Sequence, residues 1–517
     1  MNNFPWLTAL AAVPLLGAVA VSLLPSGRDL LAKQVALAVS LVPLAMTIWL
    51  ALDFDSTSKT MFQYSEIHEW IPQFGVSYAL GVDGIALVLI ALAAVLTPVC
   101  ILASWNDIDG PSAPVAGRSV KGYFALLLLL ETFMVGVFAA TDVFLFYVLF
   151  EAMLVPMYFI IGSYGGAQRS YAAVKFLLYS LVGGLLMLAA LIGLYVSSPG
   201  GDRAFLFQNL LGTDMSTGTE RLLFLGFFIA FAIKAPLWPV HTWLPDAAAE
   251  APPGGAVLLV GVLDKVGTFG MIRLCLPLFP NASKWATPVI LTLAVIGILY
   301  GALLAIGQTD MKRLIAYTSI SHFGFIVMGI FAMTTQGQSG STLYMVNHGF
   351  STAALFLIAG FLISRRGSRL VADFGGVQRV APMLAGTFLV AGLSSLALPG
   401  LSSFVSEFLV LVGTFSRYEV AAVIATAGII LASLYILLMY QRTMTGEPSE
   451  AVRKFPDLST REAWVVAPLI AVIIALGFYP KPLLDVINPA VKRTMQQVGV
   501  SDPAPRSPAG TAAEGSK

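Results

Sequence analysis

The stretch Phe231-Ala-Ile-Lys-Ala-Pro-Leu-Trp-Pro-Val-His-Thr-Trp-Leu-Pro-Asp246 decides the fold; it begins inside an apolar run that opens at Leu222. Pro236 and Pro239 have no N–H, so the carbonyls four residues before them lose their helical partners. In hydrocarbon, such backbone is tolerated only where it faces protein or a water-lined cavity. Lys234 stands beside the break, and an amine at mid-depth costs roughly 2.5–3.5 kcal/mol. A broken helix with a buried amine is typical of transporter ion sites.

The composition agrees with a membrane protein. Of 517 residues, 57% are hydrophobic and 11% are charged, with a net charge of +1, whereas soluble domains usually carry about 25% charged residues. The near-zero net charge argues against nucleic acid as a partner. Cys100 and Cys275 lack CxxC spacing and no phosphate-binding glycine loop is present, so we expect neither a metal centre nor a nucleotide site in this chain.

Apolar runs of about 20 residues, the length that spans a bilayer, recur along the chain. They predict an all-α polytopic protein with about 14 transmembrane helices. The first run has no basic segment before it and no small-residue cleavage site after it, so we expect it to be retained as a helix. The predicted spans are Phe4–Leu24, Leu30–Leu52, Gly84–Trp105, Gly122–Ala140, Val143–Ile161, Tyr171–Val196, Leu222–Trp243, Ala256–Leu276, Ala286–Ile306, Leu314–Met333, Leu343–Ile363, Met383–Phe415, Ala421–Tyr440 and Ala463–Phe478.

Basic residues predict the orientation, because Lys and Arg are concentrated in cytoplasmic loops. With the N-terminus outside, the inner loops and their edges hold most of the basic residues, and the long outer loop from Asp53 to Asp83 is acidic on balance. We therefore expect both termini to face outward. The inner basic residues are Arg28, Lys33, Arg118, Lys121, Arg169, Lys175, Lys312, Arg313, Arg365, Arg366, Arg369, Arg379, Arg442, Arg453 and Lys454.

Two discontinuous helices indicate an internal repeat. Helix seven breaks at Pro236 and Pro239, and helix twelve breaks at Pro399-Gly400. If helices four to eight and nine to thirteen are two units, each break falls on the fourth helix of its unit. Because five is odd, the second repeat must be inverted relative to the first, as in secondary transporters.

The predicted organisation follows from these units. Residues 1–120 hold helices one to three, 121–280 the first five-helix repeat, 281–442 the second, 443–480 a loop and helix fourteen, and 481–517 a C-terminal tail. The end of the tail, Ser501 to Lys517, is rich in Pro, Ala, Ser and Gly. Such a composition predicts disorder.

Seven ionisable side chains are predicted to lie inside the membrane: Glu131, Glu151, Lys234, Lys265, His322, His348 and Glu407. Any one of them can be a structural ion pair, and Glu131 is explained equally well as a partner of a loop or helix charge. Carboxylate, amine and imidazole groups together favour a proton or cation path.

The neighbours of these residues support a proton path. Pro156 frees a carbonyl one residue after Glu151, and hydroxyl groups precede His322. Burial disfavours the charged form of a carboxyl or an amine, and an opposite charge nearby favours it. A Glu151–Lys234 pair that opens and closes can therefore load and release a proton. Imidazoles suit the relay steps between lysines and the exit acid, which we assign to Glu407.

The quoted motifs carry a resemblance to a known family. Leu80-Gly-Val-Asp83-Gly-Ile, Thr141–Glu151 with Pro156-Met-Tyr, Lys234–Asp246, Lys265-Val-Gly-Thr-Phe-Gly270, Gln308–His322 and Asn347-His-Gly all resemble the antiporter-like proton-channel subunits of respiratory complex I. The match covers helices three to thirteen. Related cation/proton antiporter subunits share many of these motifs. Glu407 is typical of the M-type branch, where the L- and N-type branches have lysine, and the chain lacks the long lateral helix of the L type.

The resemblance implies a role and partners. A chain of this family is expected in a bacterial inner membrane, translocating protons while partner subunits hold the NADH, FMN, iron–sulfur and quinone sites. L-type and N-type subunits would be its neighbours. Two alternatives stay open: a cation/proton antiporter subunit that moves Na⁺, or a membrane scaffold whose charges only stabilise assembly. Asp264, beside Lys265, departs from the family pattern, in which an apolar residue is usual there.

Overall fold

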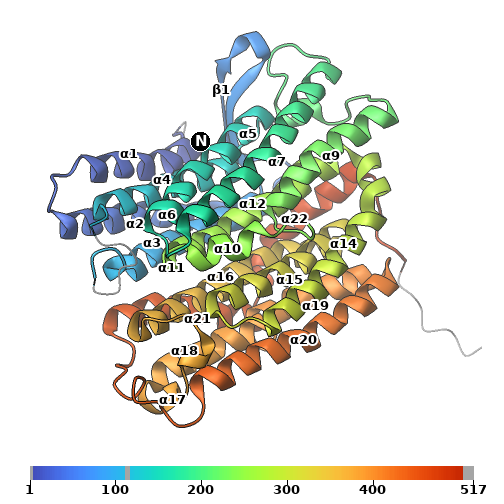
Figure 1. The fold of residues 1–517 in the computed structure, drawn as a ribbon. Helices are drawn as coiled ribbons and strands as arrows, with labels where there is room; N and C mark the ends of the chain where they lie inside the picture. Colours follow the sequence, from blue (N-terminus) through green and yellow to red (C-terminus); the bar gives the residue numbers. More distant parts are fainter. Residues whose placement is uncertain (1–3, 111–116, 505–517) are drawn as a thin grey trace, which may run out of the picture.

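The protein is a bundle of long helices, and the computed structural model describes residues 4–110 and 117–504 (Figure 1). Within these residues, twelve segments are long and apolar enough to cross a membrane. They are formed by α1 (Trp6–Leu23), α2 (Asp29–Asp53), α3 (Gly84–Ala103) with its one-turn extension Ser104–Asn106, α4 (Val120–Ala139), α5 (Val143–Ala152) with α6 (Leu154–Tyr164), α7 (Arg169–Ser197), the span Pro253–Leu278, α14 (Pro280–Ile306), α15 (Met311–Phe331), α16 (Thr335–Arg366), α20 (Glu419–Met444) and α21 (Thr460–Phe478).

The two remaining predicted spans are broken, as their prolines indicated. The first consists of α9 (Thr217–Lys234) and α10 (Trp243–Glu250), and the second of α18 (Pro382–Ser395) and α19 (Ser402–Phe415). Twelve long segments and two with wide breaks account for the fourteen spans, so the fold class is confirmed. Both breaks fall where the repeat requires them, while the inverted symmetry between the units stays a prediction.

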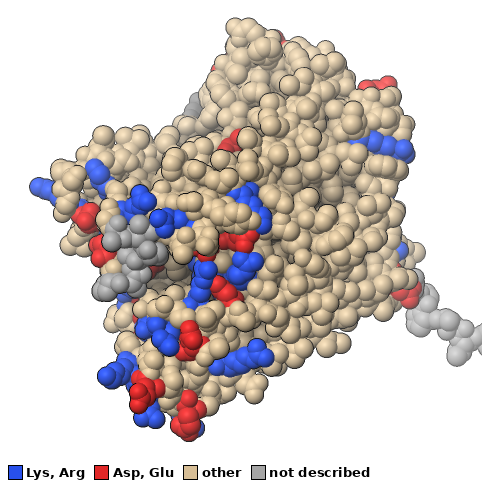
Figure 2. All heavy atoms as spheres, in the orientation of Figure 1, with Lys and Arg blue, Asp and Glu red and all other residues tan. Residues whose placement is uncertain are grey.

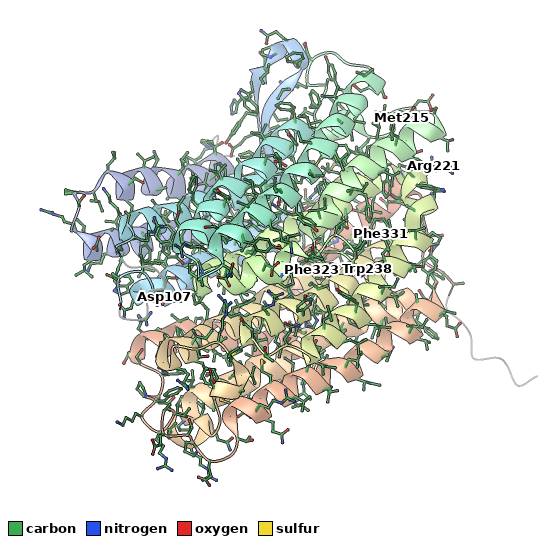
Figure 3. All side chains as sticks on the ribbon, viewed as in Figure 1. Asp107, Met215, Arg221, Trp238, Phe323 and Phe331 are labelled. Atoms are coloured by element: carbon green, nitrogen blue, oxygen red, sulfur yellow. The ribbon has the colours of Figure 1, made fainter. Side chains whose placement is uncertain are left out.

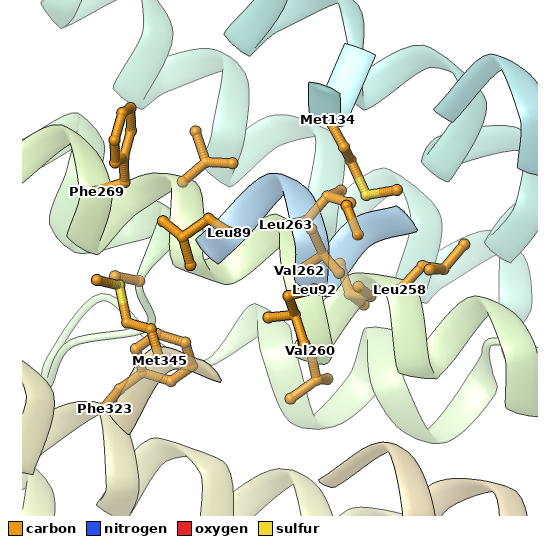
Figure 4. Close-up of a cluster of buried hydrophobic side chains, with 14 of the residues drawn as sticks. Leu89, Leu92, Met134, Leu258, Val260, Val262, Leu263, Phe269, Phe323 and Met345 are labelled. Atoms are coloured by element: carbon orange, nitrogen blue, oxygen red, sulfur yellow. The ribbon is translucent and has the colours of Figure 1, made fainter. Parts of the chain in front are cut away.

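The centre of the bundle is the span Pro253–Leu278. Its helices are α11 (Pro253–Leu258), α12 (Asp264–Gly270) and α13 (Leu276–Leu278), joined by π-helical turns at Leu259–Leu263 and Met271–Cys275. Almost all of this span is buried, and α15 and α16 beside it are similarly enclosed. Figure 4 shows this packing: Leu258, Val260, Val262 and Leu263 gather around Leu92 of α3, with Met134 of α4 on one side of them.

Two elements were absent from the sequence prediction. Within the predicted outer loop, β1 (Gln63–Ile71) and β2 (Val76–Val82) pair antiparallel as a hairpin that projects from one end of the bundle (Figure 1). Within the predicted tail, α22 (Lys481–Val498) packs against α3 and α16. The end of the predicted disordered segment, residues 505–517, lies outside the described residues. The remaining short helices are α8 (Phe207–Leu210), α17 (Val377–Val380) and the single turns Pro72–Phe74 and Val371–Asp373.

Charged residues on the visible face gather at the ends of the helices (Figure 2). A wide uncharged band separates the two ends, as a hydrocarbon core requires. Lys and Arg are concentrated at the end that carries the α14–α15, α16–α17 and α20–α21 connections, which we call the basic end. The hairpin lies at the opposite end (Figure 1).

Candidate functional site

Lys265 lies near the middle of the bundle and is completely buried. Its Nζ donates to the Val260 carbonyl at 2.5 Å, in the π-helical turn, and lies 2.7 Å from His348 Nδ1. The ammonium group is also 5.0 Å from the centroid of the Phe323 ring. Figure 3 shows the depth of this site, since Phe323 lies between Asp107 at one end of the molecule and Arg221 at the other. An ammonium donates, so His348 Nδ1 accepts and its proton is on Nε2.

A second set of contacts leads from His322 to Glu407. His322 Nδ1 lies 2.7 Å from the hydroxyl of Tyr344, and this hydroxyl lies 2.8 Å from Glu407 Oε2. The phenol has one proton; if it donates to Glu407, it accepts from His322. The rings of His322 and His348 are 5.3 Å apart, so the imidazoles stand next to each other. Four helices thus bring together Lys265, His348, His322, Tyr344 and Glu407.

Hydroxyl and amide groups surround this cluster at the break between α18 and α19. Ser395 Oγ lies 3.3 Å from His322 Nε2, and Asn347 Nδ2 donates to the Ser402 carbonyl at 2.7 Å. The loop that joins the half-helices turns at Ala397 and Gly400, both with positive φ. The break therefore exposes polar groups to the buried histidine, as expected of a discontinuous helix at a transport site.

Glu151 and Lys234 form a separate site in the first half of the chain. Lys234 Nζ lies 4.9 Å from the centroid of the Phe150 ring and 5.8 Å from that of Phe176. Lys234 Nζ and Glu151 Oε1 are both buried without a hydrogen-bond partner among the described residues. The predicted pair is thus near but not closed. A helix interruption at Met153, between α5 and α6, lies two residues after Glu151.

The break after α9 is held by side chains that the sequence motif contains. The carbonyl of Ala232, freed by Pro236, accepts from Leu237 N at 2.9 Å. The indole Nε1 of Trp243 donates to the Ile233 carbonyl at 2.9 Å. Asp246 of α10 forms ion pairs of 2.7 Å with Lys175 and 2.5 Å with Arg313. These contacts fix the helix end next to Lys234.

Two further carboxyl groups are buried without hydrogen bonds. Both oxygens of Glu131 and both oxygens of Asp264 lack a hydrogen-bond partner among the described residues, and both side chains are completely buried. Buried polar groups are nearly always hydrogen-bonded, so these two carboxyl groups are exceptions.

In the part of the chain that the structure describes, no three His, Cys, Asp or Glu side chains are placed to hold a metal ion.

A cavity of about 230 Å³ opens at the basic end between Asp107, Glu250, Lys312 and Arg369. Arg369 pairs with Glu250 at 2.8 Å, and Lys312 donates to a backbone carbonyl at 2.5 Å. Burial raises the pKa of Asp107 to about 6, although the positive charges of Arg461 and Lys312 act in the opposite direction. The sequence analysis did not single out this cluster, because its members come from four distant segments.

The structure places the seven predicted residues in three groups. Lys265, His322, His348 and Glu407 belong to one cluster, Glu151 and Lys234 are near each other, and Glu131 contacts neither group by a hydrogen bond. Sequence reasoning missed Tyr344, which bridges His322 and Glu407. Its position three residues before Asn347-His348 was the available signal, because residues three or four apart share a helix face.

Comparisons with known proteins agree with this geometry. The family described as NADH:quinone oxidoreductase/Mrp antiporter matches residues 140–432. NADH-quinone oxidoreductase subunit M of Mycobacterium tuberculosis is 55% identical, over 98% of this chain and 96% of that protein. The subunit M of Rhodobacter capsulatus is 39% identical, over 95% of this chain and 96% of its own.

Two solved structures share the fold. A chain of respiratory complex I from Thermus thermophilus with bound NADH matches with a TM-score of 0.86 and 30% identity, covering 96% of this chain and all of that one. A chain of the Mrp complex from a Dietzia species matches with a TM-score of 0.83 and 22% identity, covering 96% of this chain and all of that one. At this identity the second likeness concerns the fold alone.

Proposed function

The chain belongs to the NADH:quinone oxidoreductase/Mrp antiporter family and is a relative of its subunit M proteins; from this we propose that it is a proton-translocating membrane subunit of NADH:quinone oxidoreductase. In this proposal it works as part of a translocase and carries no redox centre. NADH, FMN, the iron–sulfur clusters and quinone are bound by partner subunits. L-type and N-type subunits are its membrane neighbours. Both termini face outward and the basic end faces the cytoplasm of a bacterial cell.

The observation that carries the proposal is the buried series Lys265, His348, His322, Tyr344 and Glu407. Three of its contacts are 2.7–2.8 Å long, which is hydrogen-bond distance. In one step, the Lys265 ammonium gives a proton to His348 Nδ1, and the imidazole releases its Nε2 proton toward His322. In the next, His322 Nδ1–H protonates the Tyr344 oxygen while the phenol proton passes to Glu407 Oε2. Tyr344 is unchanged, and Glu407 becomes a neutral acid.

In this scheme, Glu151 and Lys234 supply the proton that enters the path. The open pair is the form in which Lys234 has lost its ion-pair partner, and burial then favours release of its proton. Closing the pair favours the charged amine again. The prolines after Glu151 and Lys234 weaken both helices near these residues. The weakened backbone permits the movement without unfolding either helix.

The test is the substitution of Glu407. Glu407→Gln keeps the shape and accepts the Tyr344 hydrogen bond but cannot bind a proton. We expect the complex to assemble and oxidise NADH while pH-gradient formation per NADH in membrane vesicles falls several-fold. Glu407→Asp retains a carboxyl and should keep part of the pumping. If Glu407→Gln pumps like the parent, the exit acid lies elsewhere.

A cation/proton antiporter subunit is the alternative, because the matching family also includes Mrp antiporters and the fold resembles a chain of the Mrp complex. Purification of the intact assembly separates the two. Copurified flavin and iron–sulfur subunits support the proposed function. An assembly without them that exchanges Na⁺ for protons in vesicles contradicts it.

A further inference from the structure

Asp264 is a buried acid that the path described above does not use. It is the first residue of α12, and its side chain is completely buried. Neither Oδ1 nor Oδ2 has a hydrogen-bond partner among the described residues. A buried carboxyl without a partner is costly. The charged groups near Asp264 must therefore explain why a carboxyl group is buried at this position.

The close packing of α12 on α9 shows which way Asp264 faces. A Cβ atom on Gly267 would lie 2.6 Å from both Ala235 N and the Phe231 carbonyl, so this face of α12 abuts the end of α9. Asp264 precedes Gly267 by three residues and shares its face. Lys234 is the last residue of α9 and directly precedes Ala235, and the charges of both Lys265 and Lys234 act on Asp264. The side chain of Asp264 is thus on the Lys234 side of α12.

Lys265 faces a different direction. Successive residues of a helix are rotated by about 100°. The Lys265 side chain accordingly reaches His348 and Phe323, on α16 and α15. The Asp264 side chain therefore faces the Glu151–Lys234 site, and the Lys265 side chain faces His322 and His348. These two consecutive residues lie between the two sites. No hydrogen bond among the described residues connects Lys234 with Lys265 directly.

We propose that Asp264 relays protons from Lys234 to Lys265, so that one path runs through both halves of the chain. This inference rests on the proposed function. In the first step an N–H bond of the Lys234 ammonium breaks and an O–H bond forms on the Asp264 carboxylate, which leaves a neutral amine and a neutral acid. In the second step that O–H bond breaks and an N–H bond forms on the neutral amine of Lys265. The carboxylate is restored, and water carries the proton across any gap.

The test compares variants of the intact complex in membrane vesicles. Asp264→Asn keeps the size and polarity of the side chain but cannot carry a proton, so we expect at least a threefold loss of pH-gradient formation per NADH oxidised. Asp264→Glu keeps the carboxyl and should retain at least half of the parent value. Asp485→Asn is the matched control, because the one ion pair of this exposed acid among the described residues is with Lys481, one turn away. It should pump like the parent.

The outcomes separate this inference from the proposed path. If Lys234→Ala pumps normally, the path itself is wrong. If Lys234→Ala is impaired and Asp264→Asn pumps like the parent, only the relay is wrong. Equal losses in Asp264→Asn and Asp264→Glu would show that Asp264 acts by packing and would overturn the relay. If Asp264→Asn does not assemble, the smaller uncharged Asp264→Ser replaces it: low pumping supports the relay and normal pumping contradicts it.

Discussion

At the scale of single residues, the least expected contact is the one that Tyr344 makes. Its hydroxyl is buried between His322 and Glu407 and is close enough to hydrogen-bond to both. A tyrosine can pass a proton by receiving one and giving one at the same time, so it needs no change in its own charge. A structural tyrosine would need only one of these bonds.

Tyr344→Phe tests this role. The change removes one oxygen and keeps the ring packing, so the loss of stability should be about 1–3 kcal/mol, the cost of leaving a buried partner unsatisfied. Pumping per NADH should fall several-fold, because His322 and Glu407 are no longer connected. The measurements are pH-gradient formation in vesicles and the amount of assembled complex.

Tyr435→Phe is a matched control for this prediction. Tyr435 is also buried, but its hydroxyl has no hydrogen-bond partner among the described residues. The same chemical change should therefore leave pumping unchanged. Equal effects of the two substitutions would contradict a special role for Tyr344.

At the scale of helices, the contact of α7 with α5 sets the position of Glu151. A Cβ atom on Gly184 of α7 would lie 1.9 Å from Glu151 Oε1 and 2.4 Å from its Cδ. These atoms are near the end of a flexible side chain, so the carboxyl group can turn away without disturbing the helices. Because Gly184 has no side chain, the Glu151 carboxyl group can occupy this position near Lys234.

Gly184→Ala should separate stability from function. Alanine stabilises a helix by about 1 kcal/mol relative to glycine, so the chain should assemble at least as well as the parent. Pumping per NADH should fall, because Glu151 is displaced from its place near Lys234. Adding Glu151→Asp, which shortens the acid by one carbon, should restore part of the pumping.

Gly386→Ala provides the comparison for Gly184→Ala. Gly386 is exposed on α18, and nothing lies within 4 Å of the position of its added Cβ. The substitution should change neither assembly nor pumping. If Gly184→Ala also pumps normally, the exact position of the Glu151 carboxyl group does not matter for proton translocation.

At the scale of the whole molecule, α22 ties the end of the chain to its centre. The helix buries Ile487, Val491, Met495 and Val498, and Ser339 of α16 donates to Asn488 at 2.7 Å. Burying four such side chains contributes roughly 6–12 kcal/mol. The helix thus holds α3 and α16, which flank the Lys265 site.

Ending the chain after Tyr479 should therefore reduce the amount of this subunit in the purified complex and lower its thermal stability. Ending it after Ala504 should leave both unchanged, because this variant keeps the 2.7 Å hydrogen bond from Thr335 N to Asp502. For both truncated chains, the measurements are the amount of the subunit in the purified complex and the thermal stability of that complex. Normal assembly of the shorter chain would show that partner subunits, rather than α22, hold α3 and α16.

The sequence by itself determined the spans, the two broken helices and the depth of the charged residues. These features are local: run length sets a span, and a proline breaks the helix it stands in. The helix α22 could also have been predicted, because Ile487, Val491 and Met495 recur every four residues. That pattern lies in a polar segment, and a search for apolar runs does not find it.

Only the tertiary structure decided which buried groups meet. Tyr344 joins His322 to Glu407, Asp264 and Lys265 face two different sites, and Glu151 lies near Lys234 without a hydrogen bond to it. Each of these relations depends on how helices distant in sequence rotate and approach each other. Glycines, π-helical turns and interhelical packing set that rotation together. The relative rotation of the helices therefore cannot be predicted from any single stretch of the sequence.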